Sequence, residues 1–122
     1  MSLVEILKPD FVYEDDRGTL VQVTHDSYAQ VNTVFTKKGA IRGNYHYHKS
    51  TKEVFFVVSG EIKVKLYFDG VQEEHLFKNG DMFMIPENVR HYFEYIEDTY
   101  LIAFYTSRVE LEDGTKDIIC DE

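Results

Sequence analysis

The sequence predicts an all-β fold, either a sandwich or a barrel. Apolar and polar residues alternate along short segments, turn signals separate those segments, and the plentiful Tyr, Phe and Val favour strands over helices. The clearest segment is EIKVKLYF, in which every second residue from Ile62 to Phe68 is apolar and shares one face. Strands this short, at intervals of about 8–12 residues, are typical of sandwiches and barrels.

Each expected strand lies between breaks in this alternation. In chain order the expected strands are 19–24, 31–36, 41–46, 53–59, 61–68, 71–77, 81–85, 91–96 and 99–106. The turn signals between or before them are Arg17-Gly18, Lys38-Gly39, Ser59-Gly60, Asp69-Gly70 and Asn79-Gly80. Asp-Gly is a good two-residue hairpin turn, so the strands on either side of Asp69-Gly70 are expected to pair.

The length and composition suit a single domain covering residues 1–122. The chain has 122 residues, of which 43% are hydrophobic, so one core can form. No apolar run approaches the roughly 20 residues of a membrane helix, and MSLVEILKPD lacks the pattern of a signal peptide. Because the only cysteine, Cys120, cannot form an internal disulfide, we expect a soluble cytoplasmic protein.

The charge of the chain weighs against nucleic acid as a partner. The formal net charge is −9, whereas nucleic-acid binding rests on Lys and Arg that neutralise phosphates. A small anionic substrate stays open, because a few local cations can override the global field. The acidic tail LEDGTKDIICDE is expected to form a surface arm or to dock on a partner subunit.

The stretch HYHKSTKE contains the first candidate site. Alternation along a strand puts His46 and His48 on one face, and the neighbouring tyrosines on the other. Glu53 opens the next strand, and an antiparallel neighbour can bring it beside the histidines. Two imidazoles and a carboxylate that converge inside a barrel suit a divalent transition metal, although a plain polar loop explains the same residues.

A fourth candidate ligand lies downstream, in GDMFMIPENVRH. The expected strand 81–85 ends at Pro86, and a short loop delivers His91 to the start of the next strand. The two remaining histidines are interpreted as ordinary polar residues, because His75 belongs to a charged strand face and His25 lacks a nearby partner.

These motifs resemble those of the cupin superfamily. One cupin motif is HxH, four residues, Glu, six residues and Gly, which HYHKSTKEVFFVVSG matches from His46 to Gly60. The other is Gly, five residues, Pro and a His five positions on, which GDMFMIPENVRH matches from Gly80 to His91. The resemblance implies a single-domain jelly-roll β-barrel that holds a divalent metal such as Zn, Mn, Fe or Ni. The implied metal ligands are His46, His48, Glu53 and His91.

Two positions depart from the cupin motifs. Asn88 stands where the second motif usually has Gly, and Tyr95 stands where an Asn is often found. Asn tolerates the left-handed backbone that Gly permits, and neither change touches an implied ligand.

A narrower resemblance concerns function. FVYEDDRGTLVQV, residues 11–23, and VNTVFTKKGAIRGNYHYHK, residues 31–49, look like segments of the sugar-nucleotide cupins. These include deoxysugar 3,5-epimerases, 3,4-ketoisomerases and the cupin half of bifunctional capsular-polysaccharide enzymes, relative to which Tyr45 is one extra residue. The resemblance implies isomerisation or epimerisation of a nucleotide-linked 4-keto sugar in surface-polysaccharide biosynthesis.

The metal and this activity conflict at the histidines. Metal-free relatives use a histidine as a free base, and a nitrogen bound to a metal cannot also accept the substrate proton. The candidate catalytic residues are His46, His48 and Tyr95; other proton carriers are Tyr47, Tyr92 or a metal-bound hydroxide. Tyr95 is preferred, provided that a bulge turns it inward, because alternation points Tyr47 away from the metal.

Three arginines could pair with a substrate diphosphate, because guanidinium groups match phosphate oxygens: Arg17, Arg42 and Arg90. Each could instead form a surface ion pair. Two other functions stay open, namely a different metal-dependent cupin enzyme, such as a phosphosugar isomerase or dioxygenase, and a non-catalytic sugar- or metal-binding module. Since cupins commonly pair through edge strands, a homodimer is expected.

Overall fold

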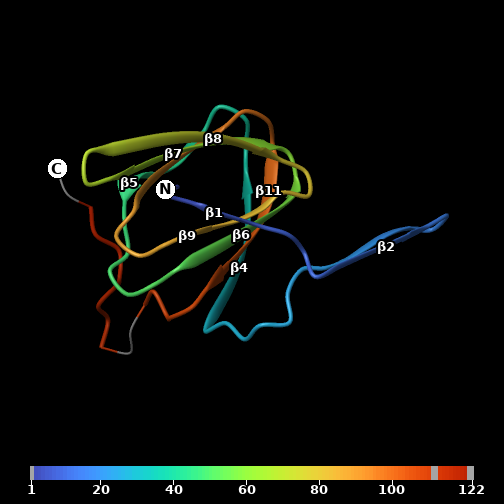
Figure 1. The fold of residues 1–122 in the computed structure, drawn as a ribbon, viewed down its shortest axis with the longest axis horizontal. Coiled ribbons are helices and arrows are strands. Elements are labelled where there is room, and N and C mark those ends of the chain that lie inside the picture. The colour runs from blue at the N-terminus through green and yellow to red at the C-terminus, as the bar shows by residue number, and fades with distance from the viewer. Residues whose placement is uncertain (1, 111–112, 121–122) are drawn as a thin grey trace.

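The computed structural model describes residues 2–110 and 113–120, which form two facing sheets and a separate hairpin (Figure 1). The strands are β1 (Glu5–Leu7), β2 (Phe11–Asp15), β3 (Gly18–Gln22), β4 (Gln30–Thr36), β5 (Ile41–His46), β6 (Glu53–Ser59), β7 (Glu61–Phe68), β8 (Val71–Lys78), β9 (Met82–Ile85), β10 (Arg90–Tyr95) and β11 (Thr99–Tyr105). In the part of the chain described, no helix is long and apolar enough to cross a membrane.

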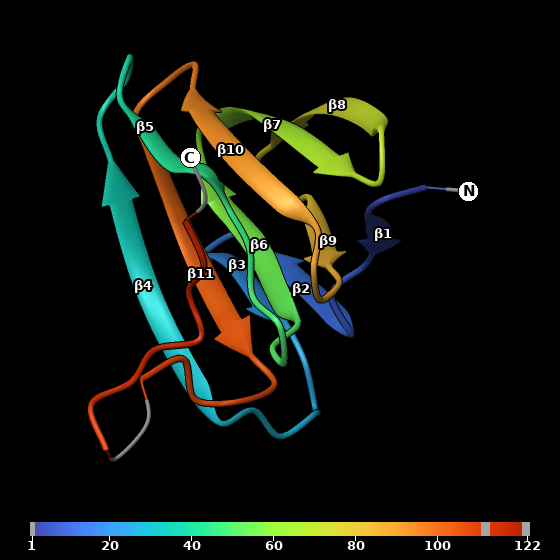
Figure 2. The same ribbon diagram turned by 90° about the vertical axis from the view of Figure 1, so that its left-hand side faces the viewer.

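The two facing sheets have the strand order of a jelly roll. One sheet runs β1-β9-β6-β11-β4 and the other β5-β10-β7-β8, so consecutive strands from β4 to β7 alternate between sheets. Figure 2 shows the two layers from the side, with β4, β11 and β6 in one and β5, β10 and β7 in the other. The expected all-β, jelly-roll architecture is confirmed.

The core fills the space between the sheets. On β7 the expected inward face is confirmed for Ile62, Val64 and Leu66, which are buried, whereas Phe68 lies at the strand end and is 44% exposed. Phe77 of the neighbouring strand β8 stacks its ring on that of Phe83 from β9 in the facing sheet, with centroids 4.0 Å apart. Alternation therefore predicts the core correctly except where a strand runs past the facing sheet.

All nine expected strands are present, and two further strands were not expected. Asp69 and Gly70 join β7 to β8 with φ angles of 50° and 80°, as a two-residue turn of type I′ requires. The missed strands are β1, which has three residues, and β2, which pairs only with β3. Neither of these strands has a regular inward face, so alternation gives no signal for them.

The β2–β3 hairpin projects from the body of the protein (Figure 1). Its base packs on the outer face of the five-stranded sheet, where Val21 and Val23 cover Val54 and Phe56 of β6. This cover explains why β6 is apolar on both faces. The rest of the hairpin is not covered in this way, and it exposes four large apolar side chains: Phe11, Val12, Tyr13 and Leu20.

Strand β4 reverses the usual alternation. Its inward positions include Gln30 and Asn32, which line a cavity between the sheets. Its outward positions include Val31 and Phe35, which are 56% and 54% exposed. Strand β4 therefore presents polar side chains to the cavity and apolar side chains to the surface.

Candidate functional site

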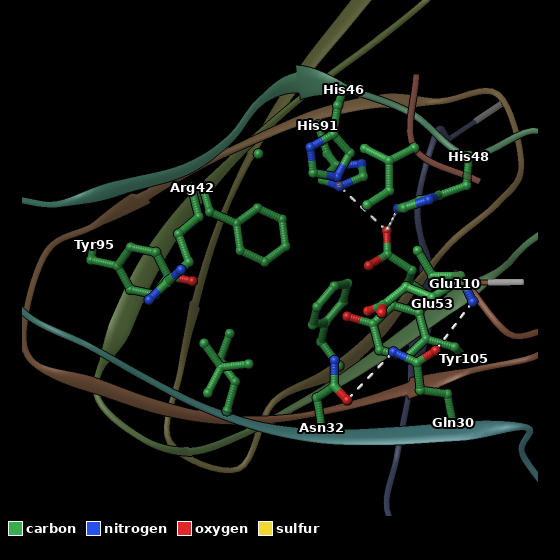
Figure 3. Close-up of a pocket in the computed structure, with 17 residues that line it drawn as sticks. Gln30, Asn32, Arg42, His46, His48, Glu53, His91, Tyr95, Tyr105 and Glu110 are labelled. Carbon is green, nitrogen blue, oxygen red and sulfur yellow. Dashed lines mark hydrogen bonds and ion pairs between the residues drawn. The ribbon is translucent and has the colours of Figure 1, made fainter. Parts of the chain in front are cut away.

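The two motifs place four ligand-type side chains at one end of the cavity (Figure 3). His46 ends β5 and faces His91 of β10 in the β5–β10 pairing, while Glu53 opens β6. The Nε2 atoms of His46 and His91 lie 3.0 Å apart. Glu53 Oε1 lies 2.8 Å from His48 Nε2 and 3.3 Å from His91 Nε2. The sequence-predicted set is thus brought together in full.

The backbone before the HxH motif is not the regular strand that we expected. Gly43, Asn44 and Tyr45 all have left-handed φ angles, of 90°, 44° and 64°, and the β5–β10 register shifts beside them. A Cβ on Gly43 would lie 2.7 Å from the backbone oxygen of His91, so only glycine fits. This irregular stretch contains the extra residue, Tyr45, and His46 still faces inward after it.

The loop before β10 is tied to the same motif. Asn88 has a left-handed φ of 69°, as expected for a position that usually carries Gly, and its N–H donates to the backbone oxygen of His48 at 2.7 Å. The segment that carries His91 is therefore connected to the one that carries His48.

The donor set fits a divalent metal ion. Its four ligand atoms lie within 4.8 Å of one another, and metal–ligand bonds of about 2.1 Å place such atoms roughly 3–4 Å apart. His48 Nδ1 donates to the backbone oxygen of Asp117, so in neutral imidazole Nε2 carries a lone pair. That lone pair faces Glu53 Oε1, and both atoms are buried with no hydrogen bond of normal geometry. A cation between them would relieve the repulsion.

Burial and mutual charge set the protonation of the cluster. Burial, followed by the charges of His91 and His48, lowers the pKa of His46 to about 4, and burial also lowers the pKa of His91. Burial alone would raise the pKa of Glu53, but the imidazoles of His91 and His48 lower it. Near neutral pH this leaves at least two neutral imidazoles and a carboxylate, which are the forms that bind metals.

The rest of the cavity extends away from the cluster. It has a volume of about 220 Å³ and is lined by residues of both sheets and of the C-terminal segment. Arg42 and Tyr95 lie at the end opposite the cluster, while Tyr105 lies beside Glu53 (Figure 3). Arg42 Nε donates to Thr36 Oγ1 at 2.8 Å, which leaves the other N–H donors of its guanidinium for a ligand.

Tyr95 faces the cavity without the bulge that we expected. Strand β10 pairs with β7 in unbroken register from Arg90 to Tyr95, so His91 and Tyr95 share the inward face by simple alternation. Burial raises the pKa of Tyr95, against opposing effects of Thr36 and Arg42.

Tyr47 and two of the predicted arginines lie outside the cavity. Tyr47 faces away from the cluster, and the guanidinium of Arg90 stacks 4.6 Å from its ring centroid while donating to the backbone oxygen of Tyr45. Arg17 lies at the hairpin tip, 82% exposed, and pairs with Asp15 at 2.5 Å. Within the protomer, therefore, only Arg42 of the three arginines lines the cavity with the cluster.

The other tyrosine and histidines also lie outside the cavity. Tyr92 stacks on Tyr45, with centroids 4.9 Å apart. His25 is exposed and lies 2.6 Å from Asp10. His75 is partly buried on the inner side of the edge strand β8, where it lies 3.0 Å from Glu73, and it does not line the cavity.

Sequence reasoning missed four polar residues that line the cavity: Gln30, Asn32, Tyr105 and Glu110. Burial and the carboxylate of Glu53 raise the pKa of Tyr105, so its phenol stays protonated. The signal was present in the sequence, because Gln30 and Asn32 occupy alternate positions of a strand whose other positions are partly apolar.

The described residues of the acidic tail correct an expectation. Residues 113–120 do not project as an arm, because they pack on the loop after β5 of the same protomer; docking of their exposed side on a partner subunit stays a prediction. Tyr47 and Ile119 exchange backbone hydrogen bonds of 3.1 and 2.9 Å, and Ile118 lines the cavity. Residues 111, 112, 121 and 122 of the tail lie outside the described residues.

Comparison with protein families gives one match. The family described as the cupin domain matches residues 32–106, which contain all four residues of the cluster. A search of curated proteins by sequence gave no significant match.

Several solved structures have the same fold. A sugar 3,4-ketoisomerase from Thermoanaerobacterium thermosaccharolyticum, in complex with TDP, has a TM-score of 0.81 at 17% identity and covers 98% of this chain and 88% of its own. A TDP-quinovose 3,4-ketoisomerase from Campylobacter jejuni has a TM-score of 0.77 at 18% identity, with 96% and 94% covered. A dTDP-4-dehydrorhamnose 3,5-epimerase from Sulfolobus tokodaii has a TM-score of 0.71 at 24% identity, with 86% and 76% covered. At these identities the likeness establishes the fold.

Proposed function

This chain belongs to the cupin family, and we propose that it isomerises or epimerises a nucleotide-linked 4-keto sugar at a metal site. The observation that carries the proposal is the composition of one cavity, with the four-residue cluster at one end and Arg42 with Tyr95 at the other. The nucleotide-sugar enzymes of the same fold support it.

The proposed metal ligands are the four clustered side chains: His46, His48, Glu53 and His91. Three imidazoles and a carboxylate suit Zn, Mn, Fe or Ni. When bound there, the metal supplies Lewis-acid polarisation of a substrate carbonyl. In this state His46 and His48 act as ligands, since their cluster-facing nitrogens are engaged.

Arg42 is the proposed contact for the substrate's diphosphate. It lines the cavity from β5, and guanidinium donors match phosphate oxygens in pairs. The cavity volume of about 220 Å³ is below the roughly 300–1,000 Å³ of pockets that enclose drug-sized ligands. The sugar would therefore enter the cavity while the nucleotide stays at its mouth. Arg17 and Arg90 remain predicted contacts of the diphosphate, but neither side chain lines the cavity.

Tyr95 is the proposed proton carrier. Acting as a base, Tyr95 would take a proton from the carbon beside the carbonyl, whose C–H electron pair forms a C=C bond while the carbonyl oxygen takes the charge. Delivery of a proton to the opposite face of the same carbon epimerises the sugar. Isomerisation instead places a proton on the former carbonyl carbon, while the hydroxyl of the deprotonated carbon passes its proton to the former carbonyl oxygen and becomes the new carbonyl. Burial raises the pKa of both Tyr95 and Tyr105, but Arg42 opposes this rise at Tyr95, whereas Glu53 adds to it at Tyr105.

We further propose a homodimer. The outward residues Val31 and Phe35 of β4 and the apolar side chains of the β2–β3 hairpin are exposed on one protomer. An isolated two-stranded hairpin is marginally stable in water, so a second copy of the chain is the proposed cover.

We propose that residues 1–122 act as one domain and that the protein functions in surface-polysaccharide biosynthesis in the cytoplasm. The exposed thiol of Cys120 suits a reducing compartment.

Proton abstraction can be tested before the product is known. Protein loaded with Zn, Mn, Fe or Ni is incubated in D₂O with TDP-4-keto-6-deoxyglucose and other nucleotide keto sugars, and NMR follows deuterium entry beside the carbonyl. We expect exchange that depends on the metal and is lost in His48→Ala. Full turnover by His48→Ala after loss of metal would refute the metal mechanism. Oxygen uptake by the iron-loaded protein would favour a dioxygenase. Binding of a nucleotide keto sugar without deuterium exchange would favour a non-catalytic binding module.

A further inference from the structure

Asp117, in the tail segment 113–120, contacts the loop between β5 and β6 through its carboxylate. Oδ1 accepts from the backbone N–H of Lys49 at 2.8 Å. Oδ2 accepts from the N–H of Ser50 at 2.9 Å and from Thr51 Oγ1 at 2.7 Å. Thr51 is 1% exposed, so its hydroxyl needs this partner. One carboxylate thus satisfies three consecutive residues that lie between His48 and Glu53.

The same residue contacts the ring of His48 through its main chain. The backbone oxygen of Asp117 accepts a hydrogen bond from His48 Nδ1. A carbonyl oxygen is only an acceptor, so Nδ1 must carry the proton, and neutral His48 presents the lone pair of Nε2 to the cluster. The contact therefore fixes both the orientation and the tautomer of this imidazole.

The backbone on both sides holds Asp117 in place. Its own N–H donates to the backbone oxygen of Val109 at 2.7 Å. Two residues later, Ile119 exchanges hydrogen bonds with Tyr47. The carbonyl that meets His48 is thus positioned by the fold of the tail, and the carboxylate joins that tail to the loop.

We propose that Asp117 is a positioning residue for the metal site. Its carboxylate holds the loop that links two of the ligands, and its carbonyl turns His48 so that Nε2 faces Glu53. The part of this inference that concerns metal affinity rests on the proposed metal site, whereas the part that concerns His48 does not. Outer-shell partners that orient a ligating histidine typically change metal affinity by about 10- to 100-fold.

The test compares Asp117→Asn with Asp113→Asn. Asp113 lies on the same segment, is exposed, and accepts from Thr115, at 3.0 Å from N and 2.7 Å from Oγ1. Both variants lose one negative charge, but only the first loses contacts to the β5–β6 loop. Long-range ¹H–¹⁵N NMR of the metal-free proteins, recorded at a pH at which the ring is neutral, reports the tautomer of His48, assigned with His48→Gln. Competition with a chromophoric chelator measures the affinity for Zn²⁺.

We expect Asp117→Asn to lose the single Nδ1–H tautomer of His48 and to bind Zn²⁺ at least tenfold more weakly, while Asp113→Asn behaves as wild type. An unchanged tautomer would overturn the proposal, and so would a changed tautomer with unchanged Zn²⁺ affinity. If the wild type binds no metal ion, the proposed function fails, and the tautomer result alone decides whether Asp117 positions His48.

A second pair of variants covers the case in which Asp117→Asn does not fold. Thr51→Val keeps the shape of the side chain and removes one donor to Asp117, whereas Thr51→Ser keeps that donor. We expect a partial shift of the His48 signal and weaker Zn²⁺ binding in Thr51→Val, with recovery in Thr51→Ser. Equal behaviour of the two variants would overturn the proposal.

Discussion

His48 Nε2 lies 2.8 Å from Glu53 Oε1 in a buried site where neither atom has a hydrogen bond of normal geometry. Because His48 Nδ1 already donates to a carbonyl, two lone pairs face each other unless a proton or a metal ion lies between them. This contact therefore requires a proton or a metal ion between His48 Nε2 and Glu53 Oε1.

Replacement of Glu53 by Gln should separate metal binding from folding. The amide can donate to His48 Nε2, so the metal-free variant should melt at the same temperature as wild type or higher. Its metal affinity should fall by more than the roughly 100-fold upper range of outer-shell changes, since a ligand itself is lost. Thermal melting with and without Zn²⁺ measures both effects. Glu94→Gln, on the outer side of β10, is the control, and equal metal-induced stabilisation of all three proteins would contradict the prediction.

Stability of the metal-free protein should fall with acid. The pKa of His46 drops on folding from 6.5 to about 4, so the unfolded chain binds more protons between these values and stability is lost as the pH falls through them. The contribution of this shift is roughly 3 kcal/mol at most, because solvent screens the partly exposed ring.

Two neighbours modify this profile. The lowered pKa of His91 acts in the same direction, whereas the raised pKa of His48 opposes it, because stability from that group is present at low pH and lost as the pH rises. Urea unfolding at pH 7, 5.5 and 4.5 measures the slope, which His46→Gln should flatten. Greater stability at pH 4.5 than at pH 7 would rule out this account.

Replacement of Arg42 should weaken binding of the substrate more than replacement of Arg17 or Arg90 does. Hydrogen bonds to a charged group contribute about 1.5–3 kcal/mol, so Arg42→Ala should lower kcat/KM by roughly 10- to 100-fold. Arg90→Ala and Arg17→Ala should change it less, because those side chains lie outside the cavity of the protomer. Steady-state kinetics with a nucleotide keto sugar ranks the three, and the largest loss in Arg17→Ala would point to a hairpin that reaches a second protomer.

Tyr95 and Tyr105 can be told apart by their phenylalanine variants. If Tyr95 carries the proton, Tyr95→Phe should lower kcat by roughly 10²- to 10⁴-fold with metal content unchanged, as is typical for a general acid or base. Tyr105→Phe should have a smaller effect, because the neighbouring Glu53 keeps its phenol protonated. Single-turnover deuterium exchange measures the step directly. A larger loss in Tyr105→Phe would assign the role to that residue.

A charge on the outer face of β4 should prevent dimer formation. Phe35 is 54% exposed and lies against Tyr100, with ring centroids 6.4 Å apart. Burying a carboxylate in an apolar interface is costly, so Phe35→Glu should be monomeric. Leu76→Glu, an exposed apolar position on β8, should stay dimeric. Light scattering after gel filtration gives the masses, and a monomeric wild type would refute the interface.

The sequence predicted the strands that bury one face and missed those that do not. Strands β6 and β7 occur at the predicted residues, because their side chains meet a core. Strand β2 exposes nearly all of its length, and its alternation therefore carries no signal. The limit is physical, since a pattern of burial predicts structure only where burial occurs.

The site was predicted in a similar way. The spacing of the two motifs identified all four clustered residues. It could not reveal the left-handed stretch from Gly43 to Tyr45, nor that Tyr105 and Asp117 are brought to the cluster by strands and loops remote in sequence. Those contacts depend on tertiary packing, which local patterns do not encode.

The contact between Asp117 and His48 also bears on the order in which the site can be assembled during synthesis. All four clustered residues leave the ribosome before Asp117 does, because it follows His91 in the chain. A nascent chain that has already paired β5, β6 and β10 would hold every ligand but not the carbonyl that orients His48. Metal taken up at that stage would meet a histidine with either nitrogen exposed. The contact that orients His48 is thus available only after Asp117 has joined the chain, and a product cut short before Asp117 would lack it.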